Sequence, residues 1–218
     1  MTLKLVIGNK NYSSWSMRPW LALRANEIAF EEIFIPLYTG AADKQRILEV
    51  TRSGKVPALI DGGITVWDSL AIIEYIAERF PERRLWPTVG AARAHARSIS
   101  AEMHSGFAAL RNECGMNLRR PVGAIELSVD ARANIARVQE IWTECRERHG
   151  NSGPFLFGDF CAADAMFAPV VHRFRTYAIV VTPVVQRYMD TMMALPAFKE
   201  WTAAGLAEKL VIEKFENV

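Results

Sequence analysis

The first eighty residues alternate between short apolar runs and segments of helical periodicity. Short runs rich in β-branched and aromatic residues, bounded by turn residues, are typical of strands, whereas apolar positions three and four apart are typical of one helix face. This pattern predicts the order β-α-β-α-β-β-α. The predicted elements are strands at 3–8 and 31–35, helices at 17–26 and 42–50, a hairpin at 58–67 and a helix at 69–80.

Beyond Pro87 every strong segment has a helical period. Pro81 should stop the preceding helix because proline lacks an amide hydrogen, so residues 81–90 are interpreted as a linker. The sequence therefore predicts an α/β domain at 1–80 and an all-helical domain at 91–218. Helices are expected at 91–110, 129–148, 162–177, 183–195 and 197–206.

Composition argues against several classes of protein. Lys and Arg number 26 against 24 Asp and Glu, and no basic run is interleaved with aromatic residues, so nucleic-acid binding is not indicated. No segment approaches the roughly 20 apolar residues that span a bilayer, and the first residues lack a signal-peptide pattern. The three widely spaced cysteines match neither a disulfide framework nor a metal site. We therefore expect a cytoplasmic protein without metal, membrane or nucleic-acid partners.

The most informative stretch runs from Val56 to Ile73. Pro57 should open the first strand of the hairpin because a strand interior loses a ladder bond at proline. That placement leaves the Val56 backbone available to another partner. A helix then begins near Asp68 and Ser69, where free amides and a hydroxyl could hold a carboxylate. Together these features predict a binding place for a small extended peptide.

Three serines, Ser13, Ser14 and Ser16, gather where the first helix is expected to begin. One of them should cap the helix. A serine nucleophile would need a neighbouring base, and no histidine is close in sequence. A hydroxyl could instead donate to a bound thiolate, because a hydrogen bond to a charged acceptor contributes about 1.5–3 kcal/mol, enough to lower a thiol pKa of about 8.5 by one unit or more. The loop contains no cysteine, so the thiol would come from a cofactor.

Taken together, these motifs resemble those of the cytosolic glutathione transferases. Residues 54–59 (GKVPAL) are similar to the family's cis-proline motif, and residues 68–72 (DSLAI) to its acidic-serine motif. Residues 12–18 (YSSWSMR) resemble the serine motif of the zeta-like and related bacterial branches. The similarity covers essentially the whole chain. It implies a thioredoxin-like first domain that binds glutathione as co-substrate, and a two-fold homodimer.

The resemblance also implies which residue meets the glutathione sulfur. Ser13 or Ser14 should hydrogen-bond it, and the spacing from Arg18 favours Ser13 slightly. The second domain departs from the family pattern at Cys161, which stands where a serine or threonine usually caps the buried helix. A thiol accepts hydrogen bonds poorly, so we expect a weaker cap, which Asp164 could close from its own side.

For the rest of the tripeptide, the resemblance implies contacts from both motifs. Val56 should pair its backbone with the cysteinyl unit, next to a cis Pro57. Asp68 should meet the γ-glutamyl ammonium, and Ser69 with the helix amides its carboxylate. Lys55 either reaches the glycyl carboxylate or remains a solvated surface lysine.

The electrophile side is less well defined. In this family the helix predicted at 91–110 lines the second-substrate pocket, but the four-residue spacing of Met103 and Phe107 favours a packed stripe. His104 could act as a general acid or base, although a lone histidine on a helix is more often structural. Arg111 could anchor a carboxylate or cap a helix end. The pocket candidates are Trp15, Met103, His104, Phe107 and Arg111.

We therefore expect a glutathione transferase that joins glutathione to a small electrophile. The nearest alternative is a zeta-like cis–trans isomerase of maleyl-type diacids, and a peroxidase acting on organic hydroperoxides is also compatible. Disulfide oxidoreduction through a protein thiol is disfavoured because the loop lacks cysteine. A non-catalytic interaction module with the same fold is the alternative of another class, and the retained glutathione contacts argue against it.

Overall fold

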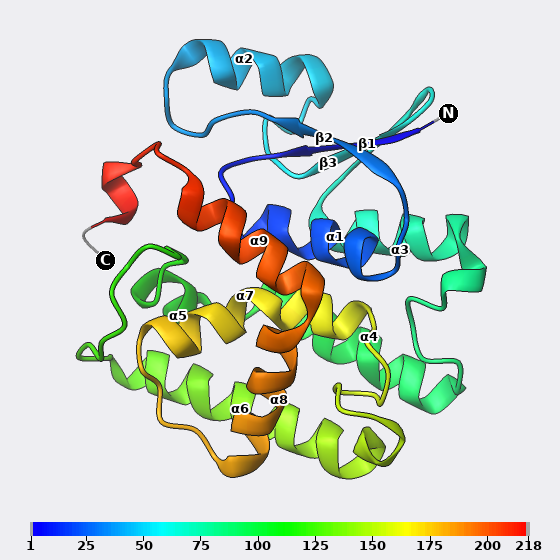
Figure 1. Cartoon of the computed structure of the whole chain (residues 1–218), viewed down its shortest axis with the longest axis vertical. Coiled ribbons are helices and arrows are strands. Elements are labelled where there is room, and N and C mark those ends of the chain that lie inside the picture. Colours follow the sequence, from blue (N-terminus) through cyan, green and yellow to red (C-terminus); the bar gives the residue numbers. More distant parts are fainter. Residues whose placement is uncertain (1, 217–218) are drawn as a thin grey trace.

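The structure is a computed structural model that describes residues 2–216. Its strands form a four-stranded sheet in the order β2-β1-β3-β4, with β1 parallel to β2 and antiparallel to β3 (Figure 1). The elements of this first part are β1 (Leu3–Ile7), α1 (Ser14–Ala25), β2 (Phe30–Phe34), α2 (Ala41–Val50), β3 (Ala58–Asp61), β4 (Ile64–Trp67) and α3 (Ser69–Arg79). The predicted thioredoxin-like β-α-β-α-β-β-α order is confirmed.

The two faces of the sheet are covered by different helices. Because side chains alternate along a strand, Leu5 and Ile7 of β1 enter the main core with α1 and α3, whereas Val6 enters a smaller cluster with Ile47 of α2. In Figure 1, α2 accordingly lies on one side of the sheet, and α1 and α3 lie on the side that faces the helical part. The starts of α1 and α3 are thereby directed toward the second part of the chain.

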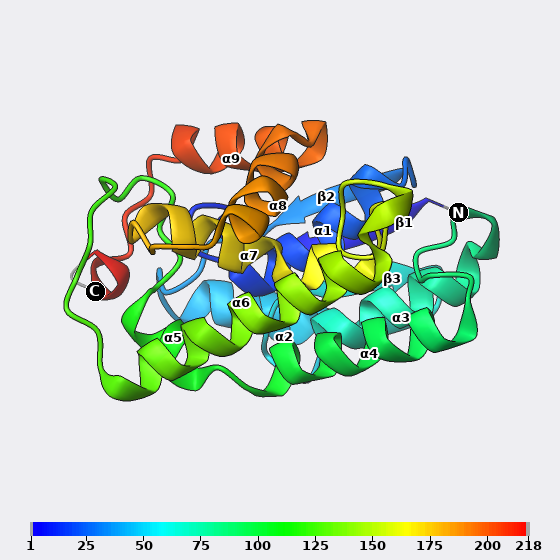
Figure 2. The ribbon, with the colours of Figure 1, turned by 90° about the horizontal axis from the view of Figure 1, so that it is seen from below.

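Within the described residues, the regular elements of the second part are helices, as predicted. Helix α7 lies at its centre, packed against α1, α4 and α8, and every one of its residues except Arg175 is buried (Figure 2). The helices are α4 (Gly90–Ser105), α5 (Ala108–Glu113), α6 (Val129–His149), α7 (Ala162–Thr176), α8 (Pro183–Ala194) and α9 (Pro196–Ala207). No helix within residues 2–216 is both long and apolar enough to cross a membrane.

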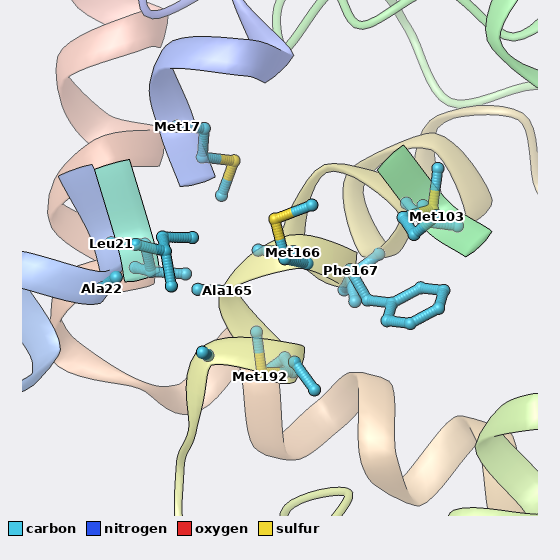
Figure 3. Packing of buried hydrophobic residues seen from close by; sticks show 14 of the residues in the cluster. Met17, Leu21, Ala22, Met103, Ala165, Met166, Phe167 and Met192 are labelled. Atoms are coloured by element: carbon cyan, nitrogen blue, oxygen red, sulfur yellow. The ribbon is translucent and has the colours of Figure 1, made fainter. Parts of the chain in front are cut away.

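A single hydrophobic core crosses the boundary between the two parts. Figure 3 shows Met17 and Leu21 of α1 pointing toward Ala165 and Met166 of α7, and all four belong to the same buried cluster. Burying a Leu or Met side chain stabilises a fold by about 1.5–3 kcal/mol. The two parts therefore hold one another in register, so side chains from both can form a defined site.

The start of the first helix differs from its prediction at residue 17. Helix α1 begins at Ser14, because the Ser13 side chain accepts a hydrogen bond from Ser16 N and caps it. Pro19 is therefore the sixth helical residue and not part of the first turn, where a missing amide has no consequence. The predicted start at residue 17 would have placed Pro19 in the first turn, so that prediction of the helix start was wrong.

The helix predicted at 91–110 is two helices. Helix α4 ends at Ser105, Gly106 is extended, and Phe107 adopts a left-handed conformation with φ of 58° before α5 begins. A Cβ at Gly106 would lie 2.8 Å from the Glu102 carbonyl oxygen, so the chain can leave α4 in this direction because residue 106 is glycine. The continuous pattern of apolar residues across 91–110 concealed this break.

Candidate active site

Residues predicted for the glutathione side and for the electrophile side meet around the Trp15 indole. Trp15 of α1 lies edge-on to the His104 ring of α4, with centroids 5.3 Å apart. His104 Nε2 lies 3.2 Å from Asp68 Oδ2, which precedes α3. The half-buried Arg111 guanidinium of α5 lies 5.5 Å from the Trp15 ring centre. Four helices from both parts of the chain thus contribute to one site.

Two of the pocket candidates lie elsewhere. Met103 and Phe107 are 1% and 7% exposed and belong to the main hydrophobic core. This is the packing role that their four-residue spacing favoured, although Phe107 lies beyond the end of α4. The backbone next to Met103 nevertheless contacts a site residue, because Arg111 Nη1 donates to the His104 carbonyl oxygen at 3.1 Å.

At the start of α3, one buried polar group has no partner among the residues that the structure describes. Asp68 is the N-cap and accepts from Leu70 N at 2.9 Å and from Ala71 N at 3.3 Å. Its φ of 77° lies in a region that non-glycine residues rarely adopt and that is enriched at ligand sites. The Ser69 hydroxyl is buried, and no described residue forms a hydrogen bond with it. The arrangement offers a hydroxyl and helix amides to an anion, beside a carboxylate that suits a cation.

The loop before β3 has the backbone geometry of the proline motif. The Val56–Pro57 peptide bond is cis, and Pro57 is buried directly before β3 begins at Ala58. Val56 lies outside the ladder that pairs β3 with β1, which begins at Ala58. Lys55 is exposed. An extended peptide could therefore add its backbone at Val56, while Lys55 extends from the rim.

The serines at the start of α1 already have partners within the protein. The Ser13 hydroxyl donates to Ser16 Oγ at 2.8 Å and accepts from Ser16 N at 3.3 Å. Ser16 Oγ in turn accepts from Gly8 N at 3.1 Å, which ties the helix start to the end of β1. Ser14 Oγ accepts from Arg173 Nη2 of α7 at 3.4 Å. Ser13 thus caps the helix, and Ser14 faces a guanidinium.

Three arginines surround these residues with positive charge. The Arg18 guanidinium lies over the Trp15 ring at 4.3 Å, and no described residue accepts a hydrogen bond from its Nη1. Burial, followed by the charges of Arg173 and Arg111, lowers the pKa of Arg18 to about 9, and burial lowers the pKa of Arg173 to about 10. Both remain cationic at neutral pH. The site therefore favours an anion.

Sequence reasoning missed Arg173 and used Arg18 only as a marker of spacing. Arg18 donates from Nε to the Met166 carbonyl oxygen at 3.2 Å, and Arg173 donates from Nη1 to the Arg111 carbonyl oxygen at 3.2 Å. The available signal was that Arg173 lies inside the largely apolar helix predicted at residues 162–177, since arginine is rarely buried unless its donors are satisfied. Which helix it faces could not be deduced from that signal.

The C-terminal segment also packs on the serine loop. Tyr12, directly before Ser13, accepts from Arg119 Nη2 at 2.6 Å and from Ile212 N at 3.2 Å, and its hydroxyl donates to Glu216. Glu208 accepts from Lys10 N at 2.6 Å. These long-range contacts fix the loop from its outer side, and no local pattern indicated them.

Cys161 and Asp164 lie at the start of α7. Burial raises the pKa of the Cys161 thiol well above its usual range, which makes it unreactive. The Asp164 carboxylate accepts from Cys161 N at 2.9 Å, so it does contribute to the start of α7 from its own side. Among residues 2–216, no group of three or more His, Cys, Asp or Glu side chains is arranged to hold a metal ion.

Comparison with known proteins places the chain in one family. The model of the glutathione S-transferase N-terminal domain matches residues 12–79, and that of the C-terminal domain matches residues 91–204. A probable maleylacetoacetate isomerase of Caenorhabditis elegans is 29% identical over 189 residues, which cover 85% of this chain and 87% of the relative. The maleylacetoacetate isomerase of Pseudomonas aeruginosa is 27% identical and covers 91% of this chain and 94% of its own.

A solved structure has the same fold. The crystal structure of a glutathione transferase homolog from Burkholderia GL BGR1, with bound glutathione, superimposes with a TM-score of 0.71 at 24% identity and covers 94% of this chain and 98% of its own. The two matched domain models lie in the order of the two parts of the fold. The chain therefore belongs to the cytosolic glutathione transferase family.

Proposed function

We propose that the protein is a glutathione-dependent enzyme that stabilises the glutathione thiolate with a serine hydroxyl and adds the sulfur to a small electrophile. The observation that carries the proposal is the Ser69 hydroxyl, which is buried at the start of α3 without a described partner. A buried polar group left unpaired costs about 1–3 kcal/mol, so its persistence points to a ligand that completes it.

Glutathione has the groups that this site lacks. Its γ-glutamyl end carries a free carboxylate for Ser69 and the α3 amides, and an ammonium for Asp68. Asp68 Oδ1 accepts the hydrogen bonds that cap α3. The other oxygen, Oδ2, faces His104 and is the atom that would accept from the ammonium. The extended cysteinyl unit would pair with the Val56 backbone, which directs its sulfur toward the start of α1.

The start of α1 supplies the chemistry that a thiol needs. A free thiol with a pKa of about 8.5 is only a few per cent ionised at neutral pH, and each unit of lowering multiplies the anion about tenfold. A serine hydroxyl, the helix N-terminus and the nearby guanidiniums all favour the anion. Sulfur then forms a bond to the electrophilic carbon. In a substitution, the electron pair of the broken bond departs with the displaced group, and in an addition, the π electron pair moves to the activating group. Holding both reactants together adds to the rate.

The arginines favour a second candidate, a cis–trans isomerase of anionic unsaturated acids. Arg18, Arg111 and Arg173 bond to carbonyl oxygens and to Ser14, with no carboxylate in ion-pair distance among the described residues. Guanidinium groups suit carboxylates, and both relatives described above are named maleylacetoacetate isomerases, one of them as probable. In such a reaction the thiolate adds to the double bond, the single bond rotates, and elimination returns the thiolate.

The two candidates differ in what happens to glutathione. A maleyl-type diacid should be converted with glutathione unchanged in amount if the protein is an isomerase, whereas a halogenated or nitro-activated electrophile should consume it in a transferase. Arg111→Gln should raise KM for the diacid, with kcat less affected, if Arg111 binds its carboxylate.

Glutathione binding itself is tested by thermal unfolding. A ligand present at ten times its Kd should stabilise the protein by about 1.4 kcal/mol and raise Tm measurably. Ser69→Ala should reduce the shift, while Ser98→Ala, which alters an exposed serine on α4, should preserve it. Absence of any shift at millimolar glutathione would contradict the proposal and favour a non-catalytic interaction module.

We also expect a homodimer, as the family resemblance implies. Ile64 and Trp67 of β4, at the edge of the sheet, are 52% and 54% exposed. Large apolar side chains on an edge strand are typical of contact surfaces. Light scattering should report twice the mass of one chain, and Trp67→Lys should lower it if this edge forms the contact.

A further inference from the structure

Arg173 is a buried cation with an unusual set of partners. It lies in the central helix α7, is 5% exposed, and donates from Nη1 to the carbonyl oxygens of Arg111 and Cys114 at the end of α5. Its Nη2 lies 3.4 Å from Ser14 Oγ in the other part of the chain. A buried charge is costly unless its hydrogen bonds are made, and this one makes them without a carboxylate. Among residues 2–216, therefore, no carboxylate pairs with this charge next to Ser14.

The two serines at the start of α1 differ in what their protons do. The Ser13 proton is given to Ser16 Oγ, and the Ser13 oxygen accepts from Ser16 N, so both sides of this hydroxyl serve the cap. For Ser14, the hydrogen bond found among the described residues is the one accepted from Arg173. A hydroxyl that accepts from a cation has its own proton left to donate, and it becomes a stronger donor because successive hydrogen bonds polarise one another.

We propose that Arg173 is a positioning residue that holds and polarises the Ser14 hydroxyl, so that Ser14, and not Ser13, donates to the thiolate of bound glutathione. This inference rests on the proposed function. The carbonyl oxygens at the end of α5 anchor one arm of the guanidinium, so the other arm keeps its direction toward α1. The helical part of the chain thereby takes part in activating a thiol that is bound by the first part.

Neighbouring charges act in the same direction but by another route. Arg18 and Arg111 lie over the Trp15 ring, at 4.3 and 5.5 Å from its centre, and they favour any anion placed near the start of α1. Their influence does not pass through the Ser14 hydroxyl, because neither donates to it among the described hydrogen bonds. A double-mutant cycle between residues 14 and 173 can therefore separate the two routes.

The test is the ionisation of the thiol of bound glutathione, followed by thiolate absorbance against pH in the full-length protein. Arg173→Gln and Ser14→Ala should each raise the thiol pKa by about one unit, an approximately tenfold loss of thiolate at neutral pH. The loss of thiolate in the double variant should exceed the loss in either single variant by no more than about twofold. Arg173→Lys, which keeps the charge, should keep part of the wild-type lowering of the thiol pKa. Arg175→Gln, at the exposed position on the same helix, should leave the thiol pKa at the wild-type value.

The outcomes are separable. A lowered thiol pKa in the wild type that is unchanged in Arg173→Gln, or additive effects in the double variant, would overturn this inference and leave the proposed function standing. An ordinary thiol pKa in the wild type would overturn both. If Arg173→Gln does not fold, Ser14→Ala still decides, because it leaves the α5 anchors intact: the inference requires Ser14→Ala to raise the thiol pKa more than Ser13→Ala does.

Discussion

At the start of α3 the Ser69 hydroxyl is buried without a described partner, whereas at the start of α1 the hydroxyls of Ser13 and Ser14 are both held by the protein. Asp68 caps α3 with its own carboxylate, so Ser69 is not needed for that purpose. A group without a partner gains most when a ligand arrives, whereas a group already held in place can act on a ligand without first being ordered. The comparison indicates that α3 provides binding and α1 provides activation.

The largest expected effect separates the two helix starts directly. Ser69→Ala should raise the Kd for glutathione about tenfold to a hundredfold, because a hydrogen bond to a charged group contributes about 1.5–3 kcal/mol. The thiol pKa of the glutathione that still binds should stay at the wild-type value. Calorimetric titration and thiolate absorbance measure the two quantities. The opposite result, unchanged affinity with a raised thiol pKa, would contradict the division between binding and activation.

Acid destabilisation limits the pH range over which this comparison holds. Burial, followed by the charge of Arg175, lowers the pKa of His172 to about 3, while the unfolded value is about 6.5. The unfolded chain therefore takes up the proton first. The stability linked to neutral His172 is complete above about pH 6.5 and is lost as pH falls toward 3. At pH 5 the loss is about 2 kcal/mol.

Urea unfolding of the wild type and of His172→Gln at neutral and acid pH measures this effect. The variant should lose about 2 kcal/mol less on going to pH 5. Asp164 has the opposite sign, because burial raises its pKa to about 6, and it cancels when the two proteins are compared. Equal losses in both proteins would show that His172 is not the group responsible.

A smaller effect should distinguish Ser13 from Ser14. Ser13→Ala should lower the free energy of unfolding by about 1 kcal/mol, because it removes the N-cap of α1, and Ser13→Thr should keep most of it. Denaturant unfolding provides the measurement. If Ser13→Ala leaves stability unchanged but raises the thiol pKa more than Ser14→Ala does, Ser13 is the thiolate donor and the two serines exchange roles.

The smallest effect concerns the charge at α3. Asparagine caps helices about as well as aspartate, so Asp68→Asn should keep the helix start intact. It should weaken glutathione binding only about threefold, because partly exposed ion pairs contribute about 0.2–1 kcal/mol. Calorimetric titration at low and high salt would show whether the difference is screened. A loss as large as that of Ser69→Ala would show that the ammonium contact contributes as much to glutathione binding as the carboxylate contact does, which would contradict this prediction.

Much of the fold could be predicted because its signals are local. Alternating apolar residues define the strands and Asp68 directly precedes α3, as the pattern indicated, whereas Pro57 lies just before β3 and not at its first residue. Errors arose where the pattern continued through a change of backbone direction: α4 ends before Gly106 although apolar spacing runs on, and α1 starts three residues earlier than its first strong apolar position. Periodicity reports the side of a segment that is buried, and it does not report where the backbone turns.

The sequence by itself determined the order of elements in the first part of the chain, the family, and which motif residues lie at the starts of α1 and α3, because these depend on residues close together in the chain. Only the tertiary structure decided that Ser69 has no partner among the described residues, that His104 meets Asp68, and that Arg173 reaches Ser14 from α7. The contact of Arg173 with Ser14 depends on how α1 packs on α7, and that of His104 with Asp68 on how α3 packs on α4. In both cases the burial of many side chains sets the position of a few polar ones.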